Sequence, residues 1–220
     1  MQARAKAAGA NSGSLLRRFA AAILATPLVA VSLSGAPAQD LGGVRQISLI
    51  ADGRVQPTKA WLAFCDRQPA ECRVNRADPE VVPFSQNLWN TLIRINRKVN
   101  AEIKPVTDIV HWGISDRWDY PTDGQGDCED IQIEKRRLLQ AEGVPARAMR
   151  IAMVINKEGE GHAVLLVRTD RGDYVLDNRV NTVMAWYRTG YVWVKREGDG
   201  GRDWVSLGGI RAPVETAARR

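Results

Sequence analysis

The sequence predicts one α+β domain in which helices precede an antiparallel sheet. Two long stretches carry apolar residues at the helical period, and a period of two, typical of strands, takes over near residue 148. A chain of 220 residues that is 45% hydrophobic is also long and apolar enough for one domain with a sizeable core. The same composition excludes a collagen-like, disulfide-dense or wholly disordered protein.

Residues 1–38 have the pattern of a secretory signal peptide. Arg17 and Arg18 precede an apolar run over residues 19–33, and small residues ending at Ala38 follow it. A transmembrane anchor would need roughly 18 or more apolar residues, and this run is shorter. We therefore expect export to the periplasm, cleavage near Ala38 and no transmembrane segment in the mature chain.

The formal charge of +6 overstates how basic the mature protein is. Four basic residues and no acidic ones lie within residues 1–38, which leaves +2 for the remainder. Because this charge is small and scattered, it gives no reason to expect a polyanion, and we predict no nucleic-acid partner.

The first elements of the mature chain are expected in this order. An extended N-terminal arm covers residues 39–56, and a short helix follows over residues 58–64. A longer helix with one buried face begins after the N-cap Ser85 and ends before Pro105. Residues 108–126 are expected to form a loop.

A second long helix is expected from Cys128 to about Glu142, where Gly143 ends it. Alternating apolar residues then predict strands over residues 148–156, 162–169, 173–176 and 191–195. The main domain would thus occupy residues 57–207, and a tail would occupy residues 208–220.

The three cysteines divide into a pair and a single residue. Cys65 and Cys72 close a short loop, and in an oxidising compartment they are expected to form a disulfide. Cys128 remains single and follows a glycine-rich loop at the start of a predicted helix. Free N–H groups and the helix dipole favour a thiolate there, so Cys128 is a candidate nucleophile; a buried structural thiol is the alternative.

The predicted hairpin brings a histidine and an aspartate together. With a turn over residues 169–172, Asp177 becomes a diagonal neighbour of His162 on the same face, and any even loop length keeps it on that face. The carboxylate could then orient the imidazole, and the imidazole could pair with the Cys128 thiolate. Each residue alone has an ordinary structural explanation, and His111, which lacks such a partner pattern, is expected to be structural.

Acidic residues surround Cys128 and should oppose its ionisation by like-charge repulsion. Acids in a first helical turn are also ordinary complements of the helix dipole. A hard cation would remove the conflict, since Asp127, Glu129 and Asp130, with a loop acid such as Asp108, offer an oxygen cluster suited to Ca²⁺. The residues alone leave both explanations open.

Several segments resemble the bacterial transglutaminase-like cysteine peptidases. They are residues 126–130, Lys135 with Leu138 and Leu139, residues 161–165, residues 172–178, and upstream residues 61–65 with Cys72, residues 96–100 and Asp108. The resemblance spans roughly residues 57–205. It implies a papain-like or transglutaminase-like core, with a nucleophile-bearing helix packed on an antiparallel sheet and with Cys128, His162 and Asp177 as the catalytic triad.

The resemblance also implies a calcium site formed by Asp108, Asp127, Glu129 and Asp130. The best-understood members of the family are periplasmic, calcium-dependent proteases that release a surface adhesin and so control biofilm attachment. For this chain the resemblance predicts an exported cysteine peptidase acting on a surface or periplasmic protein. Two alternatives use the same residues: a transglutaminase or other amide acyl-transferase, and a calcium-gated binding module with a vestigial triad.

Overall fold

The computed structural model describes residues 48–211. The expected signal peptide over residues 1–38, its cleavage site and residues 212–220 lie outside this range. Within the range, every helix is too short or too polar to cross a bilayer.

The described residues contain four α-helices and nine β-strands. The helices are α1 (Lys59–Arg67), α2 (Gln86–Glu102), α3 (Asp108–His111) and α4 (Cys128–Ala141), with single 3₁₀ turns at Ala146–Ala148 and Trp186–Arg188. The strands are β1 (Arg54–Val55), β2 (Lys104–Pro105), β3 (Gln125–Gly126), β4 (Met149–Ile155), β5 (Gly161–Thr169), β6 (Gly172–Leu176), β7 (Met184–Ala185), β8 (Val192–Glu197) and β9 (Trp204–Arg211).

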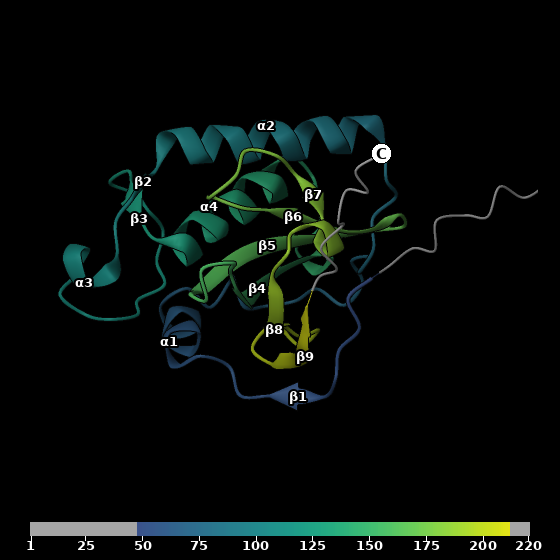
Figure 1. Ribbon diagram of the computed structural model, residues 1–220. Coiled ribbons are helices and arrows are strands. Elements are labelled where there is room, and N and C mark those ends of the chain that lie inside the picture. Colours follow the sequence, from purple (N-terminus) through teal and green to yellow (C-terminus); the bar gives the residue numbers. More distant parts are fainter. Residues whose placement is uncertain (1–47, 212–220) are drawn as a thin grey trace, which may run out of the picture. The chain divides into compact units, whose positions relative to one another are not determined.

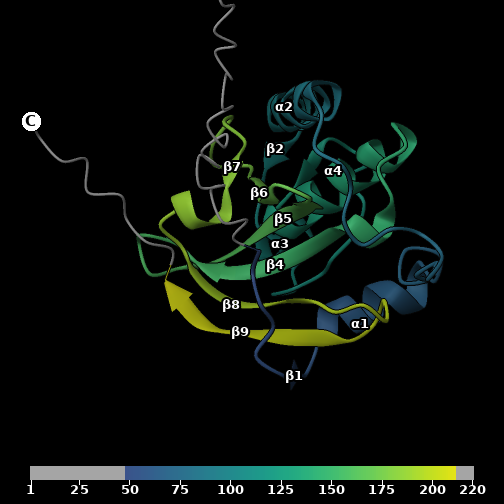
Figure 2. The same ribbon diagram turned by 90° about the vertical axis from the view of Figure 1, so that its right-hand side faces the viewer.

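Seven strands form one antiparallel sheet in the order β1-β9-β8-β4-β5-β6-β7, while β2 and β3 form a separate parallel pair. Helices α2 and α4 lie side by side over one face of this sheet, and α1 lies near its β9 side (Figures 1 and 2). The predicted α+β class, with the Cys128 helix packed on an antiparallel sheet, is confirmed.

The sheet has a core on each face because side chains alternate along its strands. On the helix-covered face, Ala163, Leu165 and Val167 of β5 pack with apolar residues of α1, α2 and α4. On the other face, Val164 and Leu166 of β5 pack in a smaller cluster. β5 therefore contributes apolar side chains to both cores.

The predicted boundaries of the two long helices and the hairpin register agree with the structure, whereas α1 extends to Arg67, beyond its predicted end at residue 64. Ser85 caps α2 by accepting a hydrogen bond from Leu88 N at 3.1 Å. Gly143 follows α4 with a φ of +86°, a conformation that glycine adopts without strain. Arg168 pairs with Asp173 across the β5–β6 hairpin, as the turn over residues 169–172 requires.

Several elements lie where the sequence predicted none. β1 falls inside the expected N-terminal arm and pairs with β9, which continues to Arg211, beyond the predicted boundary at residue 207. α3 and β3 lie inside the expected loop over residues 108–126. β1, α3 and β3 are short or irregular, so they lack a readable period. The eight-residue strand β9 was not predicted either.

The predicted disulfide is present between Cys65, in α1, and Cys72, with Cα atoms 5.5 Å apart. Both cysteines are buried in the core of the helix-covered face. The crosslink therefore ties the end of α1 to the segment that follows it.

Candidate active site

Cys128 is the first residue of α4, and its side chain is half-buried. Its thiol donates a hydrogen bond to Glu129 Oε2 at 2.9 Å. Burial raises the pKa of the Cys128 thiol well above its usual range, and the charges of Glu129 and Asp127 add to this effect. A hydrogen bond with the backbone of Ala163 acts in the opposite direction.

His162, near the start of β5, is buried against Asp177, which follows β6. His162 Nε2 lies 2.9 Å from Asp177 Oδ1, and the Tyr191 hydroxyl donates to Asp177 Oδ2 at 2.5 Å. Burial alone would raise the pKa of Asp177, but the hydrogen bonds with His162 and Tyr191 lower that pKa below its ordinary value.

The backbone of Asp177 is held by two asparagines of α2. Asn96 Oδ1 accepts a hydrogen bond from Asp177 N at 3.1 Å, and Asn100 Nδ2 donates to Asp177 O at 2.9 Å. The backbone N–H of Arg179 donates to Asp177 Oδ1 at 2.9 Å. Hydrogen bonds to the backbone and to the side chain of Asp177 therefore hold in place the carboxylate that faces His162.

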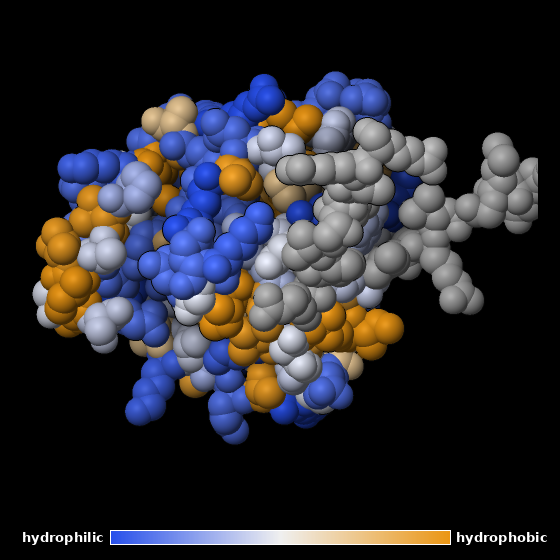
Figure 3. Space-filling view, in the orientation of Figure 1, coloured by the Kyte–Doolittle hydropathy of each residue, from blue (hydrophilic) through white to orange (hydrophobic). Residues whose placement is uncertain are grey.

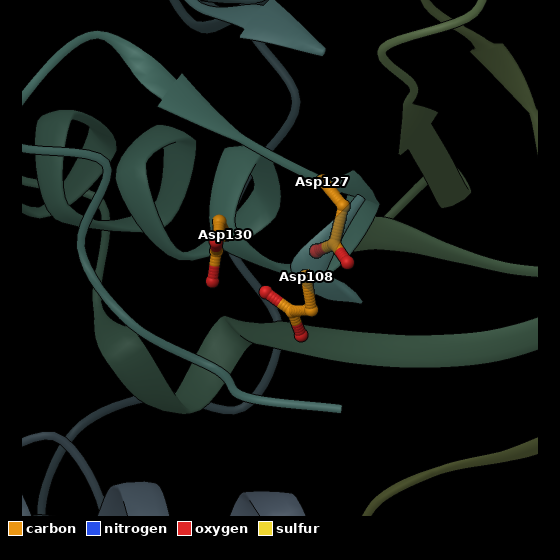
Figure 4. A group of neighbouring side chains, drawn as sticks. All are labelled: Asp108, Asp127 and Asp130. Atoms are coloured by element: carbon orange, nitrogen blue, oxygen red, sulfur yellow. The ribbon is translucent and has the colours of Figure 1, made fainter. Parts of the chain in front are cut away.

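A cluster of carboxylates lies beside the N-terminus of α4. Asp108, at the start of α3, points towards Asp127 and Asp130 (Figure 4). One oxygen from each of these three lies within 4.8 Å of the others, and Asp108, Asp116 and Glu129 form an overlapping group on the same criterion. Asp127 occupies the N-cap position of α4 but makes no side-chain cap bond.

The hydrogen bonds in this acidic cluster leave some oxygens without partners. The backbone N–H of Arg117 donates to Asp108 Oδ2, and that of Asp119 donates to Asp130 Oδ1 at 2.6 Å. By contrast, Asp108 Oδ1 and Asp127 Oδ1 are buried without hydrogen-bond partners. Buried anionic oxygens need a compensating charge or donor, so this donor set fits a hard divalent cation.

Crowding of carboxylates shifts their protonation. Burial, together with the charges of Glu129 and Asp108, raises the pKa of Asp127 to about 8. Burial, together with the charges of Asp127 and Asp108, raises the pKa of Asp130 to about 8. A bound cation would favour the ionised forms, because an opposite charge stabilises a carboxylate.

The structure therefore brings the predicted residues together in two groups. His162 and Asp177 are in contact as the hairpin register requires, and Cys128 begins α4, which packs against β5, the strand that carries His162. Among the described residues, the thiol hydrogen bond goes to Glu129 and not to His162.

A family model described as bacterial transglutaminase-like cysteine proteinase matches residues 51–212. The chain belongs to this family. It is a cysteine peptidase with the transglutaminase-like fold. No curated protein matches the chain.

Solved structures of Legionella pneumophila LapG are similar to this cysteine peptidase at 23% sequence identity. The calcium-bound LapG structure has a TM-score of 0.47, with 71% of this chain and 81% of that chain covered. A second LapG structure and an EGTA-treated one each have a TM-score of 0.45. They cover 63% of this chain, and 71% and 70% of their own chains respectively.

Sequence reasoning missed Tyr191 and Asp116 at the site of this peptidase. Tyr191 opens a predicted strand and has no local signal that links it to Asp177, 14 residues away. Asp116 lies in an irregular loop, where no period indicates its direction. Asn96 did carry a signal, since a polar residue at a buried position of an amphipathic helix needs a hydrogen-bond partner.

His111 and Trp118 have partners in the same part of the peptidase. His111 Nε2 lies 2.8 Å from Asp123 Oδ2, so this histidine too has an acidic partner, which the sequence pattern did not indicate. The indole of Trp118 is buried, and its N–H donates to Asp116 Oδ1 at 3.0 Å.

An exposed apolar surface adjoins the acidic cluster. Ile109, Val110, Trp112 and Ile114 are all exposed, and apolar side chains gather at the α3 end of the molecule (Figure 3). Clusters of this kind are typical of surfaces that meet another molecule.

Proposed function

We propose that this cysteine peptidase hydrolyses a peptide bond of a protein substrate through Cys128, His162 and Asp177, with a calcium ion at the adjoining acidic cluster. The observation that carries the proposal is the pairing of His162 with Asp177, on a hairpin whose strand β5 packs against α4, the helix that Cys128 begins. A nucleophile, a base and an orienting carboxylate are the groups that amide hydrolysis requires.

In this mechanism the Cys128 sulfur attacks the substrate carbonyl, and the carbonyl oxygen becomes an oxyanion. The backbone N–H of Cys128 lies in the first turn of α4, where it has no intrahelical partner and can donate to that oxyanion. His162 uses Nε2 to bind Asp177, which leaves Nδ1 to exchange a proton with the sulfur. The imidazolium then protonates the leaving amine, and water activated by His162 hydrolyses the thioester.

Calcium is proposed at the acidic cluster because buried carboxylate oxygens there have no protein donor. Asp108, Asp127, Glu129 and Asp130 would hold the ion, and Asp116 lies within the same cluster. When bound, the ion supplies positive charge that neutralises the acidic residues on both sides of Cys128. We further propose that the protein is exported and acts in the periplasm, on a periplasmic or surface protein.

The test uses the mature chain, residues 39–220, and measures alkylation of Cys128 by iodoacetamide at neutral pH with calcium or with excess EGTA. Of the three cysteines, two form the disulfide, so Cys128 gives a single labelling site. Fast labelling that needs both calcium and His162 is expected, with a loss of about 100-fold or more in His162→Ala.

The matched control is His111→Ala, which removes the other histidine together with its contact to Asp123. Labelling at the wild-type rate is expected for this variant. Equal labelling of wild type and His162→Ala would reject the proposed triad, and fast labelling in EGTA would reject the calcium requirement alone. With a cleavable protein substrate, incorporation of an amine label would reveal acyl transfer in place of hydrolysis.

A further inference from the structure

One buried stripe of α4 is polar where a core-facing helix surface is usually apolar. Cys128, Gln132 and Lys135 are spaced by four and three residues, so they lie along one side of the helix. Gln132 and Lys135 are completely buried. Gln132 Nε2 donates to the side chain of Asn178 at 3.2 Å, so the stripe runs from the nucleophile to the segment that carries Asp177.

Lys135 is the unusual member of this stripe. Its Nζ is buried and makes no hydrogen bond within residues 48–211. Burial lowers the pKa of Lys135 to about 7, against the opposing attraction of Asp177, whose charge acts on it from the end of β6. The other titratable groups that bind that carboxylate are His162, from β5, and Tyr191, which immediately precedes β8.

A buried amino group without a hydrogen-bond partner is destabilising, and methionine would fill a similar volume without that cost. Packing alone therefore gives no reason for a lysine at this position. The electrostatic attraction between Lys135 and Asp177 does give a reason for a lysine here, because Asp177 also binds the imidazole of His162.

We propose that Lys135 is a positioning residue of the peptidase, whose buried amino group sets the charge balance of Asp177 and thereby the proton affinity of His162. This inference rests on the proposed roles of His162 and Asp177. When Lys135 is protonated, its charge opposes a second positive charge on the nearby imidazole. When it is neutral, the Asp177 carboxylate acts on His162 without that opposition.

The test follows the two histidine ring signals by proton NMR as the pH is varied. The chain has only His111 and His162, so each signal can be assigned from one substitution. The calcium-loaded mature protein carries Cys128→Ala, so that ionisation of the thiol does not contribute. Lys135→Met is expected to move the titration midpoint of the His162 signal upwards by roughly 0.5 to 1 pH unit, since a like charge has been removed.

Two internal controls accompany this measurement. The His111 signal should keep its midpoint in Lys135→Met, because His111 is bound to Asp123 instead. Lys98→Met removes an exposed lysine of α2 and should leave both midpoints unchanged. A purely structural Lys135 would alter the melting temperature and leave the His162 midpoint in place, and that result would overturn the proposal.

The unsubstituted Lys135 gives a second measurement that does not depend on the variant folding. Its ¹³Cε signal should titrate well below the ordinary lysine value of about 10.4, and lower still in Asp177→Asn. Ordinary titration, or no response to Asp177→Asn, would refute the proposal. Neither experiment needs peptide cleavage, so a negative result here leaves the test of Cys128 alkylation intact, and the reverse also holds.

Discussion

The hydroxyl of Tyr191 donates a hydrogen bond to Asp177 Oδ2 at 2.5 Å, on the oxygen opposite to the one that binds His162. One contact comes from β5 and the other from the residue just before β8, and together they leave the carboxylate little freedom to rotate. Tyr191 and Asp177 are both buried, so the hydroxyl and the Oδ2 oxygen each need a hydrogen-bond partner inside the protein, and they supply it to one another.

Tyr191→Phe removes this hydroxyl and leaves a buried carboxylate oxygen without its donor. We expect the free energy of unfolding to fall by about 1–3 kcal/mol and kcat to fall by about tenfold, with KM little changed. Denaturant unfolding and steady-state kinetics measure the two effects. Tyr187→Phe, in which the ring can still pack against Trp186, serves as the control. An unchanged kcat in Tyr191→Phe would show that Asp177 does not need this contact.

The calcium-free protein should become less stable as the pH rises. The pKa values of Asp127 and Asp130 are raised from 3.8 to about 8 in the folded protein, so between these values the folded state binds more protons than the unfolded state. The contribution of these two protonated carboxyl groups to the free energy of unfolding is therefore fully present below about pH 3.8 and is lost as the pH rises through about 8. Melting temperatures measured in EGTA from pH 5 to 8 test this.

Asp130→Asn provides the control for that pH series. The variant should melt higher than wild type in EGTA at pH 8, because it lacks a buried charge, and should gain less from added calcium. If the variant melts higher than wild type by the same amount with and without calcium, Asp130 is not a calcium ligand.

Gly126→Ala should disturb the acidic cluster directly. A Cβ at this position would lie 2.8 Å from Asp130 Cβ, which is too close, and 3.2 Å from Pro121 Cβ, which is tight. We expect a loss of about 1–3 kcal/mol in stability and weaker calcium binding by titration calorimetry. Gly161→Ala is the matched control, since its added Cβ would meet nothing within 4 Å. Equal calcium affinities in the two variants would argue against a site at Asp130.

The disulfide should matter for stability and not for chemistry. Replacing Cys65 and Cys72 together by alanine is expected to cost about 2–3 kcal/mol in the free energy of unfolding, because the unfolded chain gains freedom. The rate of Cys128 alkylation below the melting transition should match that of wild type. A tenfold slower alkylation would instead place the α1 crosslink in control of the site.

Local patterns predicted the long helices and the central hairpin correctly. The caps of α2 and α4 and the two-residue alternation of β5 and β6 depend on residues close in sequence, so they can be read without the rest of the chain. The adjacency of His162 and Asp177 followed from this register alone, because alternation fixes the face on which each side chain lies.

The sequence by itself therefore determined the boundaries of α2 and α4, the hairpin and the His162–Asp177 contact. Only the tertiary structure decided that Tyr191 binds Asp177, that Asp116 joins the acidic cluster, and that β1 pairs with β9. The electrostatic attraction between Lys135 and Asp177 also joins segments that are distant in sequence. Such contacts join segments that are far apart in sequence and are brought together when α4, the sheet and the loops pack around a shared core. A two-residue strand or an irregular loop has no sequence period, so its spatial neighbours cannot be predicted from sequence.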